Sequence, residues 1–395
     1  MKILMLIIWI PILAYLTFAV FYHVFLAVAY FVVKEKKNDR PAKLYQYLLF
    51  IPAHNEEGII GRLLDSLKRV DYDPGFFKTA VIADNCTDTT AEVASRFNVD
   101  VMVRNDPARR GKGFAIEWAL QNVNLDKYDA VVIADADNII GPNFFHGLNE
   151  AIDGGSEAIQ CNNCLANPGA TAFTKIIHLS RTINNELYHH AKHKLGLSSY
   201  LMGNGMCFTT GLLKRFGWKA GTIAEDYEYY AKLIKQNEMV GFAANSRLYH
   251  QESQGIQQAT DQRIRWSSGR FQVARTYGWD LLKKGLKEGN YCIIDAAFPL
   301  ILPNLSLMVE ATGMALLVAL LMTIIYPVPF VVYWLVFLIM LEIAYFLCGV
   351  YLTKMPLGQF LYAVAFAPVF LVWKGLIDVK GLSGKKIGQW GRAKR

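Results

Sequence analysis

The feature that most constrains the fold is an apolar run at residues 131–134 that ends in Asp135-Ala136-Asp137. A run of β-branched residues without alternating polar ones is typical of a strand covered on both faces, as in parallel α/β sheets. Such sheets bind their ligands beyond the carboxyl ends of the strands. Leaving both carboxylates ionised and unpaired there is costly, and a divalent cation would balance them. The alternative is a solvated turn that follows a strand.

Other segments repeat this pattern of a strand followed by polar residues. The sequence predicts strands at 45–51, where Pro52 should end the strand, and at 79–83 and 99–103, with helices between them. Strands that alternate with helices indicate right-handed crossovers and a mostly parallel sheet. Asp84 follows the second strand as Asp135 and Asp137 follow the fourth, so these acids should converge on one rim.

The usual phosphate-binding glycine motifs are absent from the sequence. Neither G-x-G-x-x-G nor G-x-x-x-x-G-K-[ST] occurs, so phosphates here would need a metal ion and basic side chains. Cys161 and Cys164 form a single C-x-x-C, with no second pair to complete a zinc site. We therefore expect ordinary thiols at these positions.

Apolar blocks flank the segment that contains these motifs. The chain has 395 residues, of which 53% are hydrophobic, and this is too apolar for an ordinary soluble enzyme. Apolar residues concentrate at 4–33 and 291–373, which leaves a soluble domain of roughly 240 residues between membrane segments. The leading block is long enough to cross a bilayer and lacks a signal-peptide cleavage site.

The basic residues predict the orientation in the membrane. The leading block is followed at once by a cluster of cations, which marks the cytoplasmic side. These are Lys34, Lys36, Lys37, Arg40 and Lys43. We divide the chain into an N-terminal transmembrane helix (1–34), a cytoplasmic domain with interfacial helices near its end (35–285), C-terminal transmembrane and interfacial helices (286–375) and a basic cytoplasmic tail (376–395). The protein should be integral to the cell or plasma membrane. The net charge of +8 suits anionic lipids and phosphorylated substrates, and no pattern indicates nucleic acid.

The trailing region contains apolar stretches at 296–325, 328–352 and 360–372. An odd number of crossings would place the basic tail outside, so we expect the shortest stretch, which contains Pro368, to be interfacial or re-entrant. Glu310 and Glu342 lie inside apolar stretches, where carboxylates are costly in lipid. They should face protein or a water-filled path.

Further polar motifs lie between the sheet and the trailing region. Gly203-Asn204-Gly205 suggests either a close backbone approach or a simple turn. Glu225-Asp226 precedes a helical pattern at 227–234, where acids also suit the helix dipole. Gln262, Arg265 and Trp266 form a third group, and a tryptophan there could alternatively anchor the chain at the membrane interface.

Taken together, these residues resemble the membrane-embedded family 2 glycosyltransferases of the GT-A fold, which include cellulose, chitin and hyaluronan synthases. The resemblance runs from Ile51 to about Trp266, and its specificity comes from several motifs that occur in order. It implies an α/β GT-A domain, Rossmann-like with a mostly parallel sheet, together with transmembrane and interfacial helices. It also implies a nucleotide-sugar donor, expected to be a UDP-sugar.

The resemblance also implies roles for individual residues. Those bordering the nucleotide would be Pro52, His54, Glu56, Asp84 near the base, Lys112, Asp135 and Ala136. Asp137, with Asp135, would bind Mg²⁺ or Mn²⁺. Asp226, beside Glu225, would be the general base. Gln262, Arg265 and Trp266 would close the site, with Arg265 facing the diphosphate and Trp266 facing the acceptor sugar.

The implied reaction is a single displacement that inverts the anomeric carbon. Ala224 stands where relatives often carry threonine, so a supporting contact differs while the acids are intact. The Gln-x-x-Arg-Trp sequence occurs in processive synthases and resembles that of ceramide glucosyltransferases, so polymerisation does not follow from it. The leading hypothesis is extension of a polysaccharide. The alternatives are a single addition to a lipid acceptor and an inactive membrane scaffold, against which the intact acids argue.

Overall fold

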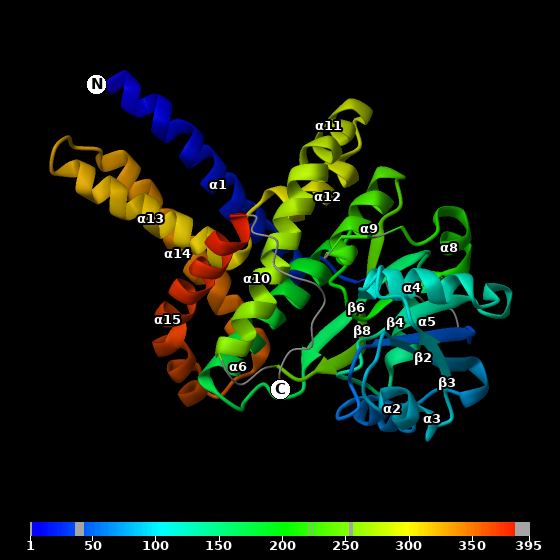
Figure 1. Cartoon of the computed structure of the whole chain (residues 1–395). Helices are drawn as coiled ribbons and strands as arrows, with labels where there is room; N and C mark the ends of the chain where they lie inside the picture. Colours follow the sequence, from blue (N-terminus) through cyan, green and yellow to red (C-terminus); the bar gives the residue numbers. More distant parts are fainter. Residues whose placement is uncertain (1, 36–42, 220, 223, 253–255, 384–395) are drawn as a thin grey trace.

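The computed structural model describes residues 2–35, 43–219, 221–222, 224–252 and 256–383. Most of the expected basic linker (36–42) and of the basic tail (384–395) therefore lie outside the described residues. An α/β domain occupies one side of the molecule, and a group of long helices extends from the other side (Figure 1).

The centre of the domain is a mixed sheet in the order β3-β2-β1-β4-β7-β6-β8-β5. Its strands are β1 (Tyr47–Ala53), β2 (Phe77–Asp84), β3 (Asp100–Arg104), β4 (Ala130–Ile133), β5 (Asn138–Ile140), β6 (Ala158–Leu165), β7 (Met206–Thr209) and β8 (Val240–His250). The pairs β1–β2, β1–β4, β2–β3 and β6–β8 are parallel. Strand β7 is antiparallel to β4 and β6, and β5 is antiparallel to β8. The prediction of a mostly parallel α/β sheet is confirmed.

Both faces of the sheet are covered, as the unbroken apolar run predicts. Along β4, Val131 and Ile133 pack into one core, whereas Ala130 and Val132 pack into another on the opposite face. The helices of the domain that follow the strands are α2 (Ile60–Leu67), α3 (Thr90–Ser95), α4 (Lys112–Gln121), α5 (Phe144–Asp153), α8 (Thr210–Phe216) and α9 (Glu225–Lys235). Successive residues of a strand point to opposite faces, so two helical layers bury them.

The prediction that Pro52 ends the first strand is wrong, because β1 continues through Pro52 to Ala53 and pairs with β2 there. The amide of Ala134 donates to the carbonyl of Phe50 at 3.0 Å, which is the last bond between β4 and β1. Pro52 lies two residues after Phe50, so its nitrogen faces the edge of β1 next to β4. Strand β4 has already ended at that level. The missing N–H therefore breaks no ladder bond.

Helices join the domain to the apolar part. They are α6 (Ala172–Thr182), a π-helical segment (Ile183–His190), α7 (Ala191–Lys194), α10 (Ile256–Val273), a second π-helical segment (Ala274–Gly278), α11 (Trp279–Glu288) and α12 (Tyr291–Ile301). The chain then forms α13 (Leu305–Thr323), α14 (Pro329–Thr353) and α15 (Leu357–Leu382). The stretch expected at 296–325 is thus split into α12 and α13.

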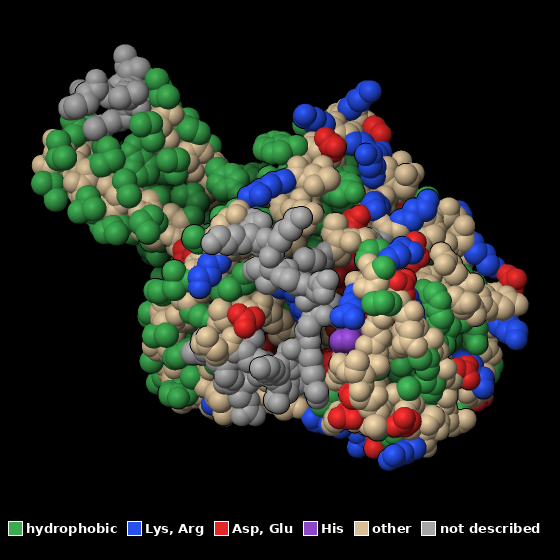
Figure 2. Space-filling view, in the orientation of Figure 1, with side chains coloured by type: hydrophobic (Ala, Val, Ile, Leu, Met, Phe, Trp, Pro, Cys, Tyr) green, Lys and Arg blue, Asp and Glu red, His purple; other side chains and the backbone are tan. Residues whose placement is uncertain are grey.

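Among the residues that the structure describes, four helices are long and apolar enough to cross a membrane: Ile7–Val32 within α1 (Lys2–Val32), α13, α14 and α15. Helices α1, α13 and α14 extend together away from the sheet, and their surface is largely hydrophobic (Figures 1 and 2). Helix α15 packs against α10 and α6 beside the catalytic domain. It is longer than the stretch expected at 360–372, and its interfacial position remains a prediction.

A buried polar cluster fixes α1 to the domain. The hydroxyl of Tyr22 donates to Asp295 Oδ1 at 2.6 Å, and Lys192 Nζ lies 2.8 Å from Asp295 Oδ2. Lys192 is fully buried; its charge is balanced by this carboxylate, and its ammonium contacts the ring of Tyr188, 4.9 Å from the ring centroid. Removing one partner of such a pair leaves an uncompensated charge. The membrane helix is therefore held in register with α7 and α12.

The acids inside the apolar stretches face protein, as predicted. Glu342 is buried and accepts a hydrogen bond from Thr312 of α13 at 2.8 Å. Glu310 packs so closely on α15 that a Cβ at Gly375 would lie 2.5 Å from its Oε2. Both carboxylates are thus shielded from lipid by neighbouring helices.

Candidate active site

The acids predicted at strand ends lie on one rim of the sheet. Strands β1, β2 and β4 run parallel, so the residues that follow their carboxyl ends share an edge. Asp135 follows β4, and Asp137 lies in the turn before β5, with buried Ala136 between them. Burial raises the pKa of Asp135, the Lys112 ammonium opposes this, and the neighbouring Asp137 adds to the rise. The two carboxylates therefore repel each other across a short distance.

Lys112 connects these acids to the second acidic pair. It is the first residue of α4, and its ammonium contacts both the Asp135 carboxylate and the carbonyl of Gly203. Burial lowers the pKa of Lys112, but the charges of Asp135, Glu225 and Asp226 outweigh burial and leave it raised. A single cation thus lies within electrostatic reach of three carboxylates contributed by two separate elements.

Glu225 and Asp226 form the first turn of α9 and point to this cation. Burial raises the pKa of Glu225 to about 7 and that of Asp226 to about 6, and in both cases Lys112 opposes the shift. Asp226 Oδ1 accepts a hydrogen bond from the amide of Tyr227 at 2.8 Å. The side chain is therefore oriented while its second oxygen stays available.

The backbone conformation and the surroundings of residue 203 require a glycine beside these acids. Gly203 has a φ of +76°, and a Cβ there would lie 2.9 Å from Asp226 Oδ2. The glycine segment thus makes a close backbone approach to the acid, not just a turn. Between the glycines, Asn204 Oδ1 accepts from the amide of Asp135 at 3.2 Å and from Asn138 Nδ2 at 2.6 Å. Asn204 therefore ties the glycine segment to the loop that carries the acids.

Helix α10 supplies the residues predicted to close the site. Arg265 is half-buried, and burial lowers the pKa of its guanidinium while Glu225 and Asp135 oppose that shift. It is thus near both acidic pairs. Gln262 is half-buried one turn earlier on the same helix face. Trp266 is 46% exposed and lines a cavity beside α9 and the membrane helices.

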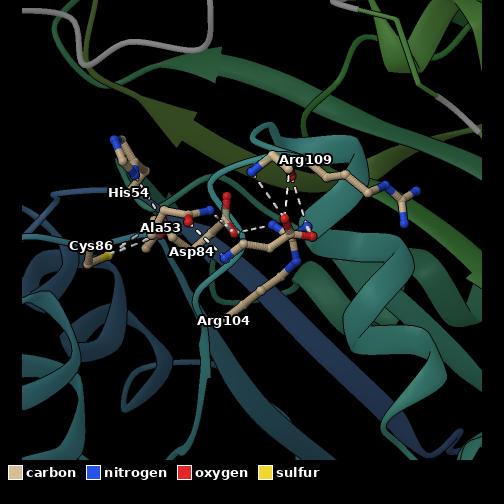
Figure 3. Close-up of polar contacts among 9 residues, drawn as sticks. Ala53, His54, Asp84, Cys86, Arg104 and Arg109 are labelled. Carbon is tan, nitrogen blue, oxygen red and sulfur yellow. Dashed lines mark hydrogen bonds and ion pairs between the residues drawn. The ribbon is translucent and has the colours of Figure 1, made fainter.

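The residues expected around the base form a separate polar cluster on the same rim (Figure 3). His54 Nδ1 lies 2.7 Å from the carbonyl oxygen of Asp84, and Arg104 Nη1 donates to Asp84 Oδ1 at 2.5 Å. Asp84 is fully buried, and its Oδ2 has no hydrogen-bond partner among the described residues. Pro52 is buried in β1, and the Glu56 amide lies 2.8 Å from Thr90 Oγ1. The Arg109 side chain points away from this cluster.

Several residues of the site are not indicated by sequence patterns. Arg104 ends β3 and neutralises Asp84, Asn204 lies between two glycines, and His250 ends β8 close enough to Asp135 to oppose the rise in its pKa. Of these three residues, Asn204 alone could have been found from the sequence, because its two flanking glycines indicate a tight turn or a close backbone approach to a ligand. Cys161 and Cys164 are free thiols on β6.

A cavity of about 570 Å³ lies among the membrane helices and reaches residues next to the candidate site in sequence. Tyr227 and Trp266, the neighbours of Asp226 and Arg265, line one end. Most of the remaining lining is apolar and comes from α6, α13, α14 and α15, including Ile176, Phe346 and Phe370. The cavity thus connects the start of α9 and the middle of α10 with the apolar half of the molecule.

Comparison with known families identifies the domain. The family model described as "Glycosyltransferase like family 2" matches residues 45–269, more than half of the chain. The chain belongs to glycosyltransferase family 2. The match covers every predicted site residue from Pro52 to Trp266 and ends within α10. The predicted family and its GT-A-like α/β fold are therefore confirmed.

Individual glycosyltransferases resemble this chain over its catalytic part. The probable glycosyltransferase YdaM of Bacillus subtilis (strain 168) is 21% identical over 243 residues, covering 59% of this chain and 57% of YdaM. The beta-monoglucosyldiacylglycerol synthase of Nostoc sp. (strain PCC 7120) is 26% identical over 251 residues, covering 60% and 51%. The chain thus spans about half the length of the curated relatives it matches.

A solved structure matches nearly the whole glycosyltransferase. The mannosyltransferase PcManGT from Pyrobaculum calidifontis, in complex with GDP-Man and Mn²⁺, superposes with a TM-score of 0.60 at 17% sequence identity. The match covers 94% of this chain and 98% of PcManGT. At this identity the similarity concerns the fold, which therefore extends to the helices beyond the catalytic domain.

Proposed function

We propose that this family 2 glycosyltransferase transfers one sugar from a nucleotide-sugar donor to a hydroxyl of a membrane lipid, with inversion at the anomeric carbon. The observation that carries the proposal is the cavity that runs from Tyr227 and Trp266 into the apolar helices. A soluble acceptor would not need such a path, whereas a lipid could place its head at the acids and its chains among α13, α14 and α15. The name of the Nostoc relative, a glycolipid synthase, supports the same acceptor class.

The donor would lie along the rim formed by β1, β2 and β4. The buried Oδ2 of Asp84 can accept a hydrogen bond from a base, and His54 lies beside it, with Nδ1 2.7 Å from the Asp84 carbonyl oxygen. Lys112 and Arg265 provide positive charge near the two acidic pairs. A UDP-sugar remains the expected donor.

The proposed chemistry is a single displacement. The bond between the anomeric carbon and the diphosphate oxygen breaks, and the nucleoside diphosphate leaves with the electron pair. A bond forms between that carbon and the acceptor oxygen. Asp226 accepts the hydroxyl proton, and Arg265 stabilises negative charge on the leaving group. The raised pKa of Asp226, about 6, makes its carboxylate a stronger base than an exposed aspartate.

The acidic rim fits a divalent cation. Asp135 and Asp137 repel each other, and His250 lies within electrostatic reach of Asp135. The described residues contain no group of three His, Cys, Asp or Glu side chains placed to hold a metal, so the donor diphosphate would complete the coordination. When bound, Mg²⁺ or Mn²⁺ would neutralise charge on that diphosphate. Asp137 and Asp135 would be its protein ligands.

The test is transfer by the purified full-length protein. The protein is incubated with UDP- and GDP-sugars, Mn²⁺ or Mg²⁺, and lipids in neutral detergent, and both released nucleotide and product mass are measured. One sugar per lipid is the expected product. A ladder of oligosaccharides would instead support polysaccharide extension, and the absence of both donor hydrolysis and transfer would support an inactive scaffold.

A further inference from the structure

The cavity contains more positive charge than its carboxylates directly balance. Arg263 is paired with Glu252 by two hydrogen bonds of 3.1 Å, and Lys374 with Asp378 at 2.7 Å. Arg181 and Arg270 also line the cavity, yet neither forms an ion pair with a carboxylate of the described chain. Glu342 is the one acid among the described residues that line the cavity, and it is hydrogen-bonded to Thr312.

The contacts of Arg181 contribute to this excess of positive charge. Its Nη1 donates to the sulfur of Met202 at 3.8 Å, the one hydrogen bond it forms within the described part of the chain, and burial lowers the pKa of the guanidinium. Glu252 opposes that shift from a longer range, but it is already bound to Arg263. Arg270, in contrast, donates to the carbonyl oxygens of Pro299 and Leu302, at 3.2 and 2.7 Å. Arg181 and Arg270 are half-buried. A partly desolvated guanidinium without a counter-charge is destabilised, and an anion would balance it.

Both guanidinium groups lie near Tyr200, which connects them to the helix that carries the predicted general base. Each is close enough to Tyr200 to interact electrostatically with its hydroxyl. The ring of Tyr200 stacks on Tyr227 with centroids 5.4 Å apart, and Tyr227 follows Asp226 in α9. An anion held between Arg181 and Arg270 would therefore lie on the same side of Tyr200 as the start of α9, where the base is.

We propose that the acceptor is an anionic phospholipid, with its phosphodiester bound by Arg181 and Arg270 and a free headgroup hydroxyl directed to Asp226. The proposal rests on the lipid acceptor proposed above and names its class. A phosphodiester fits because arginine binds phosphate through charge-assisted hydrogen bonds. A hydroxyl is required because Asp226 is placed to take a proton. A lipid phosphomonoester would bring a dianion towards Glu225 and Asp226, which already repel charge.

The test compares three lipids added to the full-length protein in neutral maltoside detergent. Phosphatidylglycerol has both a phosphodiester and a hydroxyl, diacylglycerol has only the hydroxyl, and a polyprenyl monophosphate has only the phosphate. We expect sugar transfer to phosphatidylglycerol with the lowest acceptor KM. Preferential transfer to diacylglycerol or to the polyprenyl monophosphate would overturn the inference while leaving a lipid acceptor intact.

Variants then locate the phosphate. Arg181→Gln should raise the KM for phosphatidylglycerol at least about tenfold, as expected for loss of a charge-assisted hydrogen bond. Arg181→Lys should recover part of the loss. Lys175→Gln removes a cation from the same helix, where it binds the Gly169 carbonyl at 3.2 Å, and should leave this KM unchanged. Equal KM values for Arg181→Gln and the unmodified enzyme would refute the assignment.

A binding measurement separates this inference from the proposed function. Phosphatidylglycerol should raise the unfolding midpoint of the unmodified protein, and should do so much less for Arg181→Gln, because only a ligand that binds the folded state stabilises it. If only polysaccharide is made, the proposed function fails, and the midpoint shift still decides whether Arg181 binds the phosphate. Equal shifts in both proteins would overturn the inference.

Discussion

Replacing Asp226 by asparagine removes the proposed proton acceptor and little else. Asparagine has the same shape, and its carbonyl oxygen can still accept the amide of Tyr227, which now lies 2.8 Å from Asp226 Oδ1. The amide group also fits beside Gly203, because no Cβ occupies that space. Donor binding relies on the strand-end residues and on Lys112. The variant should therefore fold and bind the donor, and lose turnover.

The expected magnitude follows from the role of a general base. Losing such a group costs about 10²- to 10⁴-fold in rate. The pKa of Asp226 is raised to about 6, so the unmodified enzyme should lose activity as the pH falls through that value. Below it, the ionised fraction falls about tenfold per pH unit. Asp226→Asn should have low activity that no longer rises with pH in this range, so its pH–rate profile should lack the ascending limb. Glu225 titrates nearby, with a pKa of about 7, so Glu225→Gln should keep an ascending limb.

The assay measures kcat and KM for the donor between pH 5 and 9 in neutral detergent, together with nucleotide binding by calorimetry. Asp280→Asn is the matched control, since Asp280 is also an acid in the first turn of a helix but is exposed. It should behave as the unmodified enzyme does. A role in donor binding would raise KM more than it lowers kcat. Near-normal turnover of Asp226→Asn, or donor affinity lost along with turnover, would refute the base assignment.

Further perturbations test the other parts of the structure. Asp137→Ala should abolish metal-dependent donor binding seen by calorimetry, and excess chelator should abolish turnover of the unmodified enzyme; full activity in chelator would contradict the metal site. Gly203→Ala should lower kcat about tenfold or more, because its methyl group would contact Asp226 Oδ2 and its backbone would be strained in the left-handed conformation. Unchanged kinetics would show that the glycine segment can shift to accommodate the methyl group. Arg263→Met should lower the free energy of unfolding by about 3–5 kcal/mol, since it removes both arginine hydrogen bonds from the buried Glu252 and leaves it the longer contact with His250, and denaturant titration measures this loss. A cysteine placed in the tail (384–395) should resist impermeant thiol reagents in intact cells, whereas labelling from outside would place the tail there.

The sequence predicted the parts of the fold that depend on local patterns. The unbroken apolar run before Asp135 identified a doubly covered strand, and alternation of strands and helices identified the parallel sheet. Pro52 was misinterpreted because a missing N–H ends a strand only where a neighbour needs it. That depends on where β4 stops, which is a property of the pairing and cannot be inferred from residues 45–52 alone.

In the candidate site, too, local sequence patterns predicted some features, whereas others depend on how distant segments pack together. Acids at strand ends and at a helix start were identified from their positions, and the structure brings Asp135, Glu225 and Asp226 within electrostatic reach of Lys112. Lys112 itself was a weak candidate from sequence, because a lysine after a glycine has no fixed direction. Its role as the link between the two acidic pairs emerges only when α4 is placed against Gly203.

Arg181 shows most clearly why function at the membrane side could not be inferred from sequence. On α6 it reads as one more basic residue in the last turn of a helix, where a cation suits the dipole. What distinguishes it is its partners within the described chain: Arg263 and Lys374 line the same cavity and are each paired with a carboxylate, and Arg181 is not. An unbalanced charge is a property of the whole cavity, to which α6, α10, α13, α14 and α15 all contribute. For the same reason, the variant that removes Arg181 should affect the acceptor, whereas variants at Asp137 should affect the donor, so the two halves of the site can be tested independently.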